Sequence, residues 1–106
     1  MKDRELRRIA REFRAGILGE QPSDLMCLAV CAPLQSFLSS LYEFNTKLEE
    51  VQFPRSNHFW LRLEDGRILD PTADQFSGDL KLPKVYLGDV PAVYRRWILE
   101  SQSPRV

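Results

Sequence analysis

NHFWLRLEDGRILDPTADQF, residues 57–76, is the stretch that decides the fold. Apolar and polar residues alternate up to Asp65-Gly66, a pair typical of the tight turn between two antiparallel strands, and a second short apolar run follows it. The stretch therefore predicts a β-hairpin. Its first strand carries His58, the single histidine of the chain, and its second strand ends at Asp70. The hairpin thus also decides whether these two polar side chains can meet.

The length of the turn decides which side of the sheet Asp70 faces. A turn of two residues places Asp70 opposite Leu61, on the apolar side of the first strand. A loop of three residues, 64–66, with its glycine in a left-handed conformation, places Asp70 opposite Trp60 and diagonal to His58. The first register would bury a carboxylate among apolar side chains without a partner, which costs several kcal/mol. We therefore predict the three-residue loop.

Two helices are expected ahead of the hairpin. Apolar residues three and four apart predict an amphipathic helix over residues 3–18, with Asp3 as its N-cap and a glycine at its end. A second apolar run follows the helix-start signal at residues 21–24, and it is apolar on so many sides that it should be a buried central helix. Pro33 either kinks this helix or marks its first turn, in which case the helix starts near residue 31.

The remaining segments complete a small α+β domain. Residues 48–53 and 84–88 are expected to be strands, residues 77–79 a loop, and Pro91 the start of a last helix before a frayed tail from residue 101. The predicted fold is a central buried helix packed on an antiparallel sheet of three to four strands, with flanking N- and C-terminal helices. At 106 residues, we expect a single domain over 1–106.

Composition argues against several classes of partner. Fifteen Lys and Arg balance fifteen Asp and Glu, so net charge favours neither nucleic acid nor an anionic membrane. No apolar run approaches the ~20 residues of a membrane span, and the charged start is unlike a signal peptide, so we expect a cytoplasmic protein. The outer face of the first helix carries several arginines among acidic residues, and a solvated face explains them better than a basic patch. They are Arg4, Arg7, Arg8, Arg11 and Arg14.

The chain contains the groups that a thiol enzyme needs. Cys27, near a helix start, can act as nucleophile, His58 as base, and Asp70 as the carboxylate that orients the imidazole. The backbone N–H of Cys27 can stabilise an oxyanion, with a side-chain amide from Gln21 or Gln75. Trp60 would form a wall of the site. We expect no cofactor.

Other interpretations of the same residues stay open. Cys31 lies one helical turn after Cys27, where a disulfide is geometrically poor, so both should be thiols and either can be the nucleophile or a small buried apolar residue. Asp74 can replace Asp70 as the orienting group. Zinc binding by both cysteines and His58 lacks a fourth ligand at a usual spacing, so we expect no metal.

These segments resemble small bacterial and phage proteins related to papain-like and transglutaminase-like thiol enzymes. Residues 57–76 resemble their His and Asp strands, MCLAVCAPLQ at 26–35 their nucleophile helix, and PKVYLG at 83–88 their closing strand. The resemblance covers roughly residues 22–88.

The resemblance implies a set of roles and an activity. It implies Cys27 as nucleophile, His58 as base, Asp70 as orienting group and Gln21, six residues before the cysteine, as oxyanion-hole glutamine. The implied chemistry is acyl transfer from an amide of a protein or peptide, as in a peptidase, deamidase or transglutaminase. The alternative is a catalytically inactive member of the fold that binds a protein partner, for example in a phage or toxin system.

Overall fold

The computed structural model describes residues 1–76 and 82–102. Along the chain the elements are α1 (Asp3–Leu18), α2 (Cys27–Tyr42), β1 (Thr46–Gln52), β2 (Asn57–Leu63), β3 (Ile68–Asp70), the short 3-10 helix η1 (Ala73–Phe76), β4 (Tyr86–Gly88) and α3 (Ala92–Gln102). The loop expected at 77–79 and the tail residues 103–106 lie outside the described residues. None of the described helices is long and apolar enough to cross a membrane.

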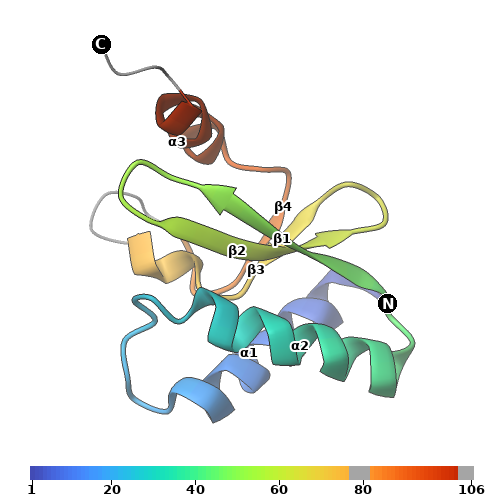
Figure 1. Ribbon diagram of the computed structural model, residues 1–106. Helices are drawn as coiled ribbons and strands as arrows, with labels where there is room; N and C mark the ends of the chain where they lie inside the picture. The colour runs from blue at the N-terminus through green and yellow to red at the C-terminus, as the bar shows by residue number, and fades with distance from the viewer. Residues whose placement is uncertain (77–81, 103–106) are drawn as a thin grey trace.

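The sheet is the middle one of three layers. Its strands are antiparallel in the order β1-β2-β3-β4, so each strand pairs with its neighbour in sequence. Helices α1 and α2 lie against one face of the sheet, and α3 lies against the other (Figure 1). The chain is thus α+β with a four-stranded antiparallel sheet, as the sequence predicts. Of the two terminal helices that the sequence predicts, α1 lies beside α2 and α3 lies on the opposite face of the sheet (Figure 1).

Each face of the sheet carries its own apolar cluster, as the two-sided burial of β2 and β3 requires. Between the sheet and the first two helices, residues of α1 and α2 pack on Leu61, Leu63 and Leu69. On the α3 side, Trp60 and Ile68 pack against residues from α3 and from the segment after β1. The strands therefore point alternate side chains into two different cores.

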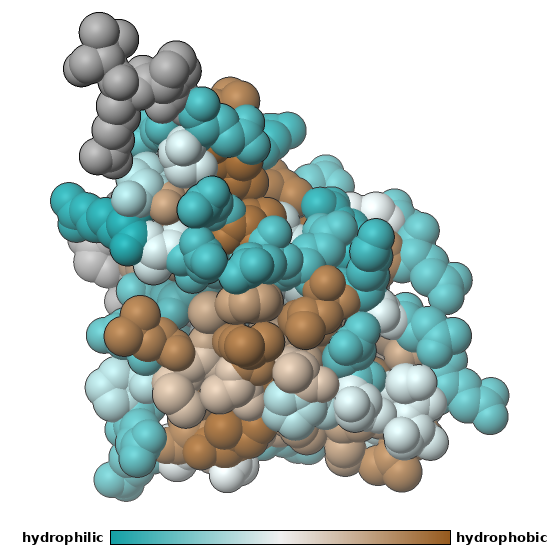
Figure 2. Space-filling view, viewed as in Figure 1, coloured by the Kyte–Doolittle hydropathy of each residue, from teal (hydrophilic) through white to brown (hydrophobic). Residues whose placement is uncertain are grey.

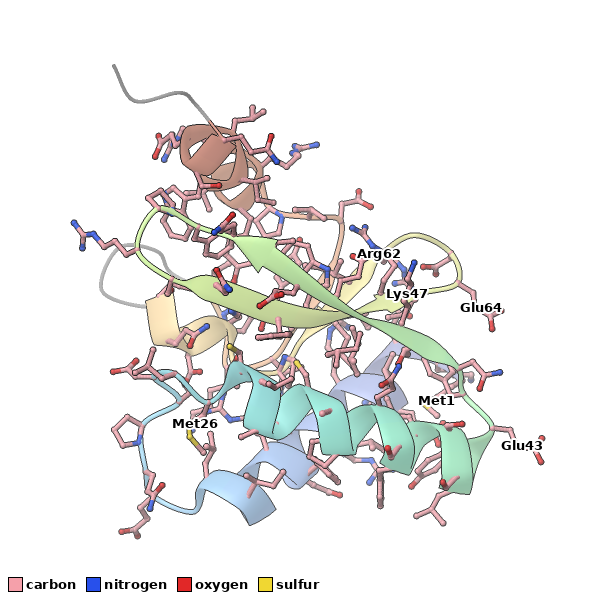
Figure 3. All side chains as sticks on the ribbon, in the orientation of Figure 1. Met1, Met26, Glu43, Lys47, Arg62 and Glu64 are labelled. Atoms are coloured by element: carbon pink, nitrogen blue, oxygen red, sulfur yellow. The ribbon has the colours of Figure 1, made fainter. Side chains whose placement is uncertain are left out.

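The hairpin has the predicted register. Leu61 pairs with Leu69 and Arg62 with Ile68. The Leu63 N–H donates to the Arg67 carbonyl, which leaves a loop of three residues that begins at Glu64 (Figure 3). The backbone at Gly66 has a φ of 93°, which favours glycine. Asp70 therefore faces the α3 side of the sheet, together with His58 and Trp60.

Helix α1 has the predicted bounds, but its faces differ from the prediction. Lys2, rather than Asp3, is the N-cap, and the Asp3 carboxylate pairs instead with Arg67 at 2.7 Å. Arg14, expected on the solvated face, is 7% exposed, while Ile17 is partly exposed. Buried residues of α1 are spaced four apart, at Leu6, Ala10, Arg14 and Leu18. Arg14 therefore lies on the buried face of the helix.

Helix α2 starts later than its sequence signal indicates. It begins at Cys27 with Met26 as N-cap, and it continues through Pro33 to Tyr42. Residues 22–24 precede it as a loop, because Leu25 adopts a φ of 62° that interrupts the helix. One side of α2 packs on the sheet and α1, but Leu28 and Leu41 on its outer side are exposed. The helix is therefore not buried all round.

The outer strands and the last helix shift by a few residues from the prediction. β1 covers Thr46–Gln52 rather than 48–53, and β4 is the short strand Tyr86–Gly88. Phe53 leaves the strand and turns into the cluster under α3. Ser101 belongs to α3 rather than to a frayed tail, and its hydroxyl donates to the Gln52 carbonyl at 2.7 Å.

Two glycine substitutions should have opposite effects on stability. Gly66→Ala should lower the free energy of unfolding by about 1–2 kcal/mol, because alanine is strained at positive φ. Gly16→Ala, in α1, should raise it by about 0.5–1 kcal/mol, because that position is helical and a Cβ there meets nothing within 4 Å. Urea unfolding followed by circular dichroism measures both, and changes of equal sign would contradict the loop geometry.

Candidate active site

His58 and Asp70 form a fully buried hydrogen-bonded pair. Nε2 of the imidazole lies 2.7 Å from Oδ2 of the carboxylate, and neither side chain is exposed. The Tyr94 hydroxyl donates to the same oxygen at 2.8 Å, and the backbone N–H of Thr72 donates to the other oxygen at 3.1 Å. Both carboxylate oxygens are therefore satisfied, and the imidazole is held in one orientation.

Tyr94 acts as a hydrogen-bond donor in this arrangement. Burial and the neighbouring Asp70 carboxylate raise the pKa of Tyr94 above its ordinary value. Its hydroxyl therefore stays protonated and stabilises the carboxylate that orients His58.

The Cys27 thiol is the candidate nucleophile that the fold brings to this pair. Cys27 is the first residue of α2, and its thiol interacts electrostatically with the His58 imidazole. Burial alone would raise the pKa of the Cys27 thiol, but the His58 hydrogen bond and backbone hydrogen bonds from Phe59 and Leu28 outweigh it and lower that pKa. The helix N-terminus adds positive potential at the same place. The sulfur is therefore held in a setting that favours the thiolate.

The pKa of the His58 imidazole shifts in the opposite direction from that of the thiol. Burial disfavours its charged form, but hydrogen bonds to Asp70 and Cys27 prevail and raise the pKa of His58 to about 9. The lowered thiol pKa and the raised imidazole pKa both favour a thiolate beside an imidazolium at neutral pH. This ion pair is the reactive form of a thiol nucleophile.

Gln75 lies against the other ring nitrogen. Its amide nitrogen is 2.6 Å from Nδ1 of His58. Because Asp70 occupies Nε2, we infer that Cys27 and Gln75 share the Nδ1 side of the ring. An amide offers both N–H donors and an oxygen acceptor, so Gln75 can accompany either protonation state of the imidazole.

Aromatic rings enclose the imidazole on the α3 side. Phe53 stacks on His58 at 5.4 Å between ring centroids, and the edges of Phe76 and Tyr94 approach it at 5.0 and 5.7 Å. Trp60, expected as a wall of the site, is buried with its ring 6.1 Å from that of His58 and donates to Glu49. These rings exclude water from the imidazole, which strengthens its hydrogen bonds.

A second, partly buried ion pair joins α1 to η1 beside the site. The Arg14 guanidinium contacts both oxygens of Asp74 at 2.7 and 3.0 Å and also donates to the Pro71 and Lys84 carbonyls. The hydroxyl of Ser23, in the loop before α2, donates to Asp74 at 2.7 Å. Asp74 thus pairs with Arg14, whereas Asp70 is the carboxylate that contacts His58.

The remaining sequence candidates lie away from the imidazole. Cys31 is fully buried with its thiol 3.5 Å from the Phe59 carbonyl, and burial raises the pKa of Cys31 well above its ordinary value. Gln21 is exposed, and its side chain makes no hydrogen bond to another described residue. Within residues 1–76 and 82–102, no group of three His, Cys, Asp or Glu side chains could hold a metal ion.

Sequence reasoning missed the roles of Tyr94 and Arg14 in this site. Tyr94 shares a helix face with Trp97 and Ile98, three and four residues later, and this spacing is a signal that could have placed it in the core. Arg14 fits the spacing of the buried residues of α1, but its charge predicts that the side chain is exposed to solvent. No local signal names Asp74 as its partner.

Alkylation should distinguish the two thiols. In a Cys31→Ala background, Cys27 should react with iodoacetamide well below the pH at which an ordinary thiol ionises, because His58 stabilises the thiolate. His58→Gln should move the pH profile upward, with about tenfold slower labelling at neutral pH for each unit of pKa. Mass spectrometry measures the labelling rate, and circular dichroism checks that the variants are folded. In Cys27→Ala the remaining Cys31 should stay unlabelled, because it is fully buried. An unchanged profile in His58→Gln would contradict the ion pair.

Loss of the Asp74 charge should destabilise the fold. Asp74→Asn leaves the buried Arg14 without its counter-ion and should cost about 3 kcal/mol at neutral pH. Burial raises the pKa of Asp74, but hydrogen bonds to Arg14 and Ser23 outweigh it and lower that pKa. The stability contribution is therefore present above the ordinary carboxyl pKa and is lost as pH falls through the lowered one.

The exposed pair of Arg8 and Glu12 supplies the control for this measurement. Glu12→Gln should change stability by less than about 0.5 kcal/mol. Urea unfolding at several pH values tests both variants, and equal effects would contradict the role of Arg14.

No protein-family model, no curated protein and no solved structure matches this chain. The chemistry of the site therefore has to be argued from its own residues.

Proposed function

We propose that this protein is a cysteine-dependent acyl-transfer enzyme that acts on an amide bond. The observation that carries the proposal is the buried 2.7 Å contact between His58 and Asp70. The Cys27 thiol, at the first residue of α2, interacts with the same imidazole, which lowers the pKa of the thiol. A helix-borne Cys, a His on one strand and an Asp on the next also support a papain-like or transglutaminase-like core.

The reaction follows the thiol mechanism. The Cys27 thiolate attacks the carbonyl carbon of the amide, and a carbon–sulfur bond forms as the carbonyl oxygen becomes an oxyanion. When the carbon–nitrogen bond breaks, the imidazolium of His58 gives its proton to the leaving amine. The thioester then reacts with water or a second amine, whose proton passes to His58, and the thiolate is regenerated. Asp70 keeps the ring oriented through both steps.

Donors for the oxyanion are available at the start of α2. The N–H groups of the first turn, including that of Cys27, have no partner four residues earlier within the helix, and they carry the positive end of its dipole. Gln75, at the imidazole, is the amide best placed to contribute, while Gln21 would have to turn in from its exposed position. The substrate would be a protein or peptide amide.

An activated ester tests the thiol chemistry without knowledge of the substrate. p-Nitrophenyl acetate should release one equivalent of nitrophenolate in a burst and add one acetyl group to Cys27, located by mass spectrometry. Cys27→Ala should abolish the burst, His58→Ala should slow it by about 10²–10⁴-fold, and Cys31→Ala should retain it.

Competition between water and glycine methyl ester for the acetyl-enzyme separates hydrolysis from transfer. If folded protein is not acetylated on Cys27, an enzymatic function is contradicted. That outcome would favour a module that acts by occupying the surface of a protein partner.

A further inference from the structure

Leu25 combines two unfavourable features just before the nucleophile. Its φ of 62° lies in the left-handed region, where glycine or asparagine is the less strained residue. Its side chain is 85% exposed, so the leucine gains almost nothing from burial in return. Non-glycine residues held in this conformation concentrate at functional sites, where a ligand can use them.

The exposed leucine belongs to an apolar surface at the start of α2. Leu28, in the first turn, is 45% exposed, and Met26 between them lies at the N-terminal end of the helix (Figure 3). Figure 2 shows apolar residues gathered over the part of the surface where α2 runs, with hydrophilic residues around them. We call Leu25, Met26 and Leu28 the apolar lip.

The position of the apolar lip indicates what would cover it. Cys27 is 6% exposed, so its sulfur is reached across the residues that flank it. The Cα atoms of Leu25 and Cys27 are at most about 7.6 Å apart, because consecutive Cα atoms are 3.8 Å apart. The acyl part of the substrate becomes bonded to the sulfur and is therefore held within two residues of the lip. The amine part leaves when the amide bond breaks, so it is the weaker candidate for this surface.

We propose that the apolar lip binds an extended apolar group on the acyl side of the scissile bond. This inference rests on the proposed function, and it names the substrate class as amides whose acyl component carries a large uncharged side chain. The strain at Leu25 then has a role, because the left-handed backbone keeps the leucine exposed two residues before the thiol instead of including it in the helix.

The length of the acyl chain tests the proposal. p-Nitrophenyl hexanoate should acylate Cys27 of the wild type about tenfold faster than the acetate, which corresponds to burial of two of the added methylenes. Leu25→Asn, which tolerates positive φ, and Leu28→Asn should each reduce this ratio to within about twofold of unity. Leu25→Asn should unfold at no lower urea concentration than the wild type.

Leu41, near the other end of the same helix and 65% exposed, supplies the matched control. It is about 20 Å along the axis from Cys27, so Leu41→Asn should keep the wild-type ratio. Two results would overturn the inference and leave the proposed function standing. One is acylation of Cys27 at the same rate by both esters, and the other is a loss of the preference in Leu41→Asn as large as in Leu25→Asn.

Two further outcomes would also overturn the inference. A wild-type dimer that Leu25→Asn dissociates would assign the lip to a second copy of the chain. Failure of both esters to acylate Cys27 would overturn the proposed function together with the inference.

Discussion

The hydrogen bond between His58 and Asp70 is the constraint on which the rest of the structure depends. Two polar side chains without solvent contact must satisfy each other, because an unpaired buried carboxylate or imidazole costs several kcal/mol. The pair forms only if β2 and β3 meet in one register, and a shift of one residue would turn Asp70 into the apolar core below. The same register brings Leu61 opposite Leu69 in that core. Folding and the candidate chemistry therefore depend on one geometric choice.

The site joins segments that are distant in sequence, and each brings a group that supports another. Tyr94 from α3 holds the carboxylate, Gln75 from η1 meets the imidazole, and α2 supplies the thiol at its first residue. Asp74 in η1 accepts hydrogen bonds from Arg14 of α1 and from Ser23 in the loop before Cys27. It therefore connects both to the segment that carries Gln75. The aromatic rings around the imidazole keep water away, so few hydrogen bonds suffice to shift its pKa. The buried imidazole and carboxylate are thus held by several partners, while the residue two positions before the thiol is an exposed, strained leucine.

Much of the fold could be predicted from local patterns. The hairpin register followed from turn chemistry and from the cost of burying Asp70 among apolar residues, and α1 followed from its apolar spacing and its terminal glycine. The pairing of His58 with Asp70 was a consequence of that register. Cys27 and Cys31 could not be distinguished, because the choice depends on where α2 begins. Ser23 and its neighbours look like a helix start, but the Ser23 hydroxyl bonds to Asp74 and the helix begins only at Cys27.

The sequence by itself determined the bounds of α1, the antiparallel hairpin and the side of the sheet that His58 and Asp70 share, because these depend on contacts between residues close in the chain. Only the tertiary structure decided that Arg14 turns inward to Asp74, that Tyr94 completes the carboxylate, and that α3 covers the opposite face of the sheet from α2. Those contacts join residues 24 and 60 positions apart. Their partners are selected by packing and by the need to satisfy buried charge, which no local periodicity encodes.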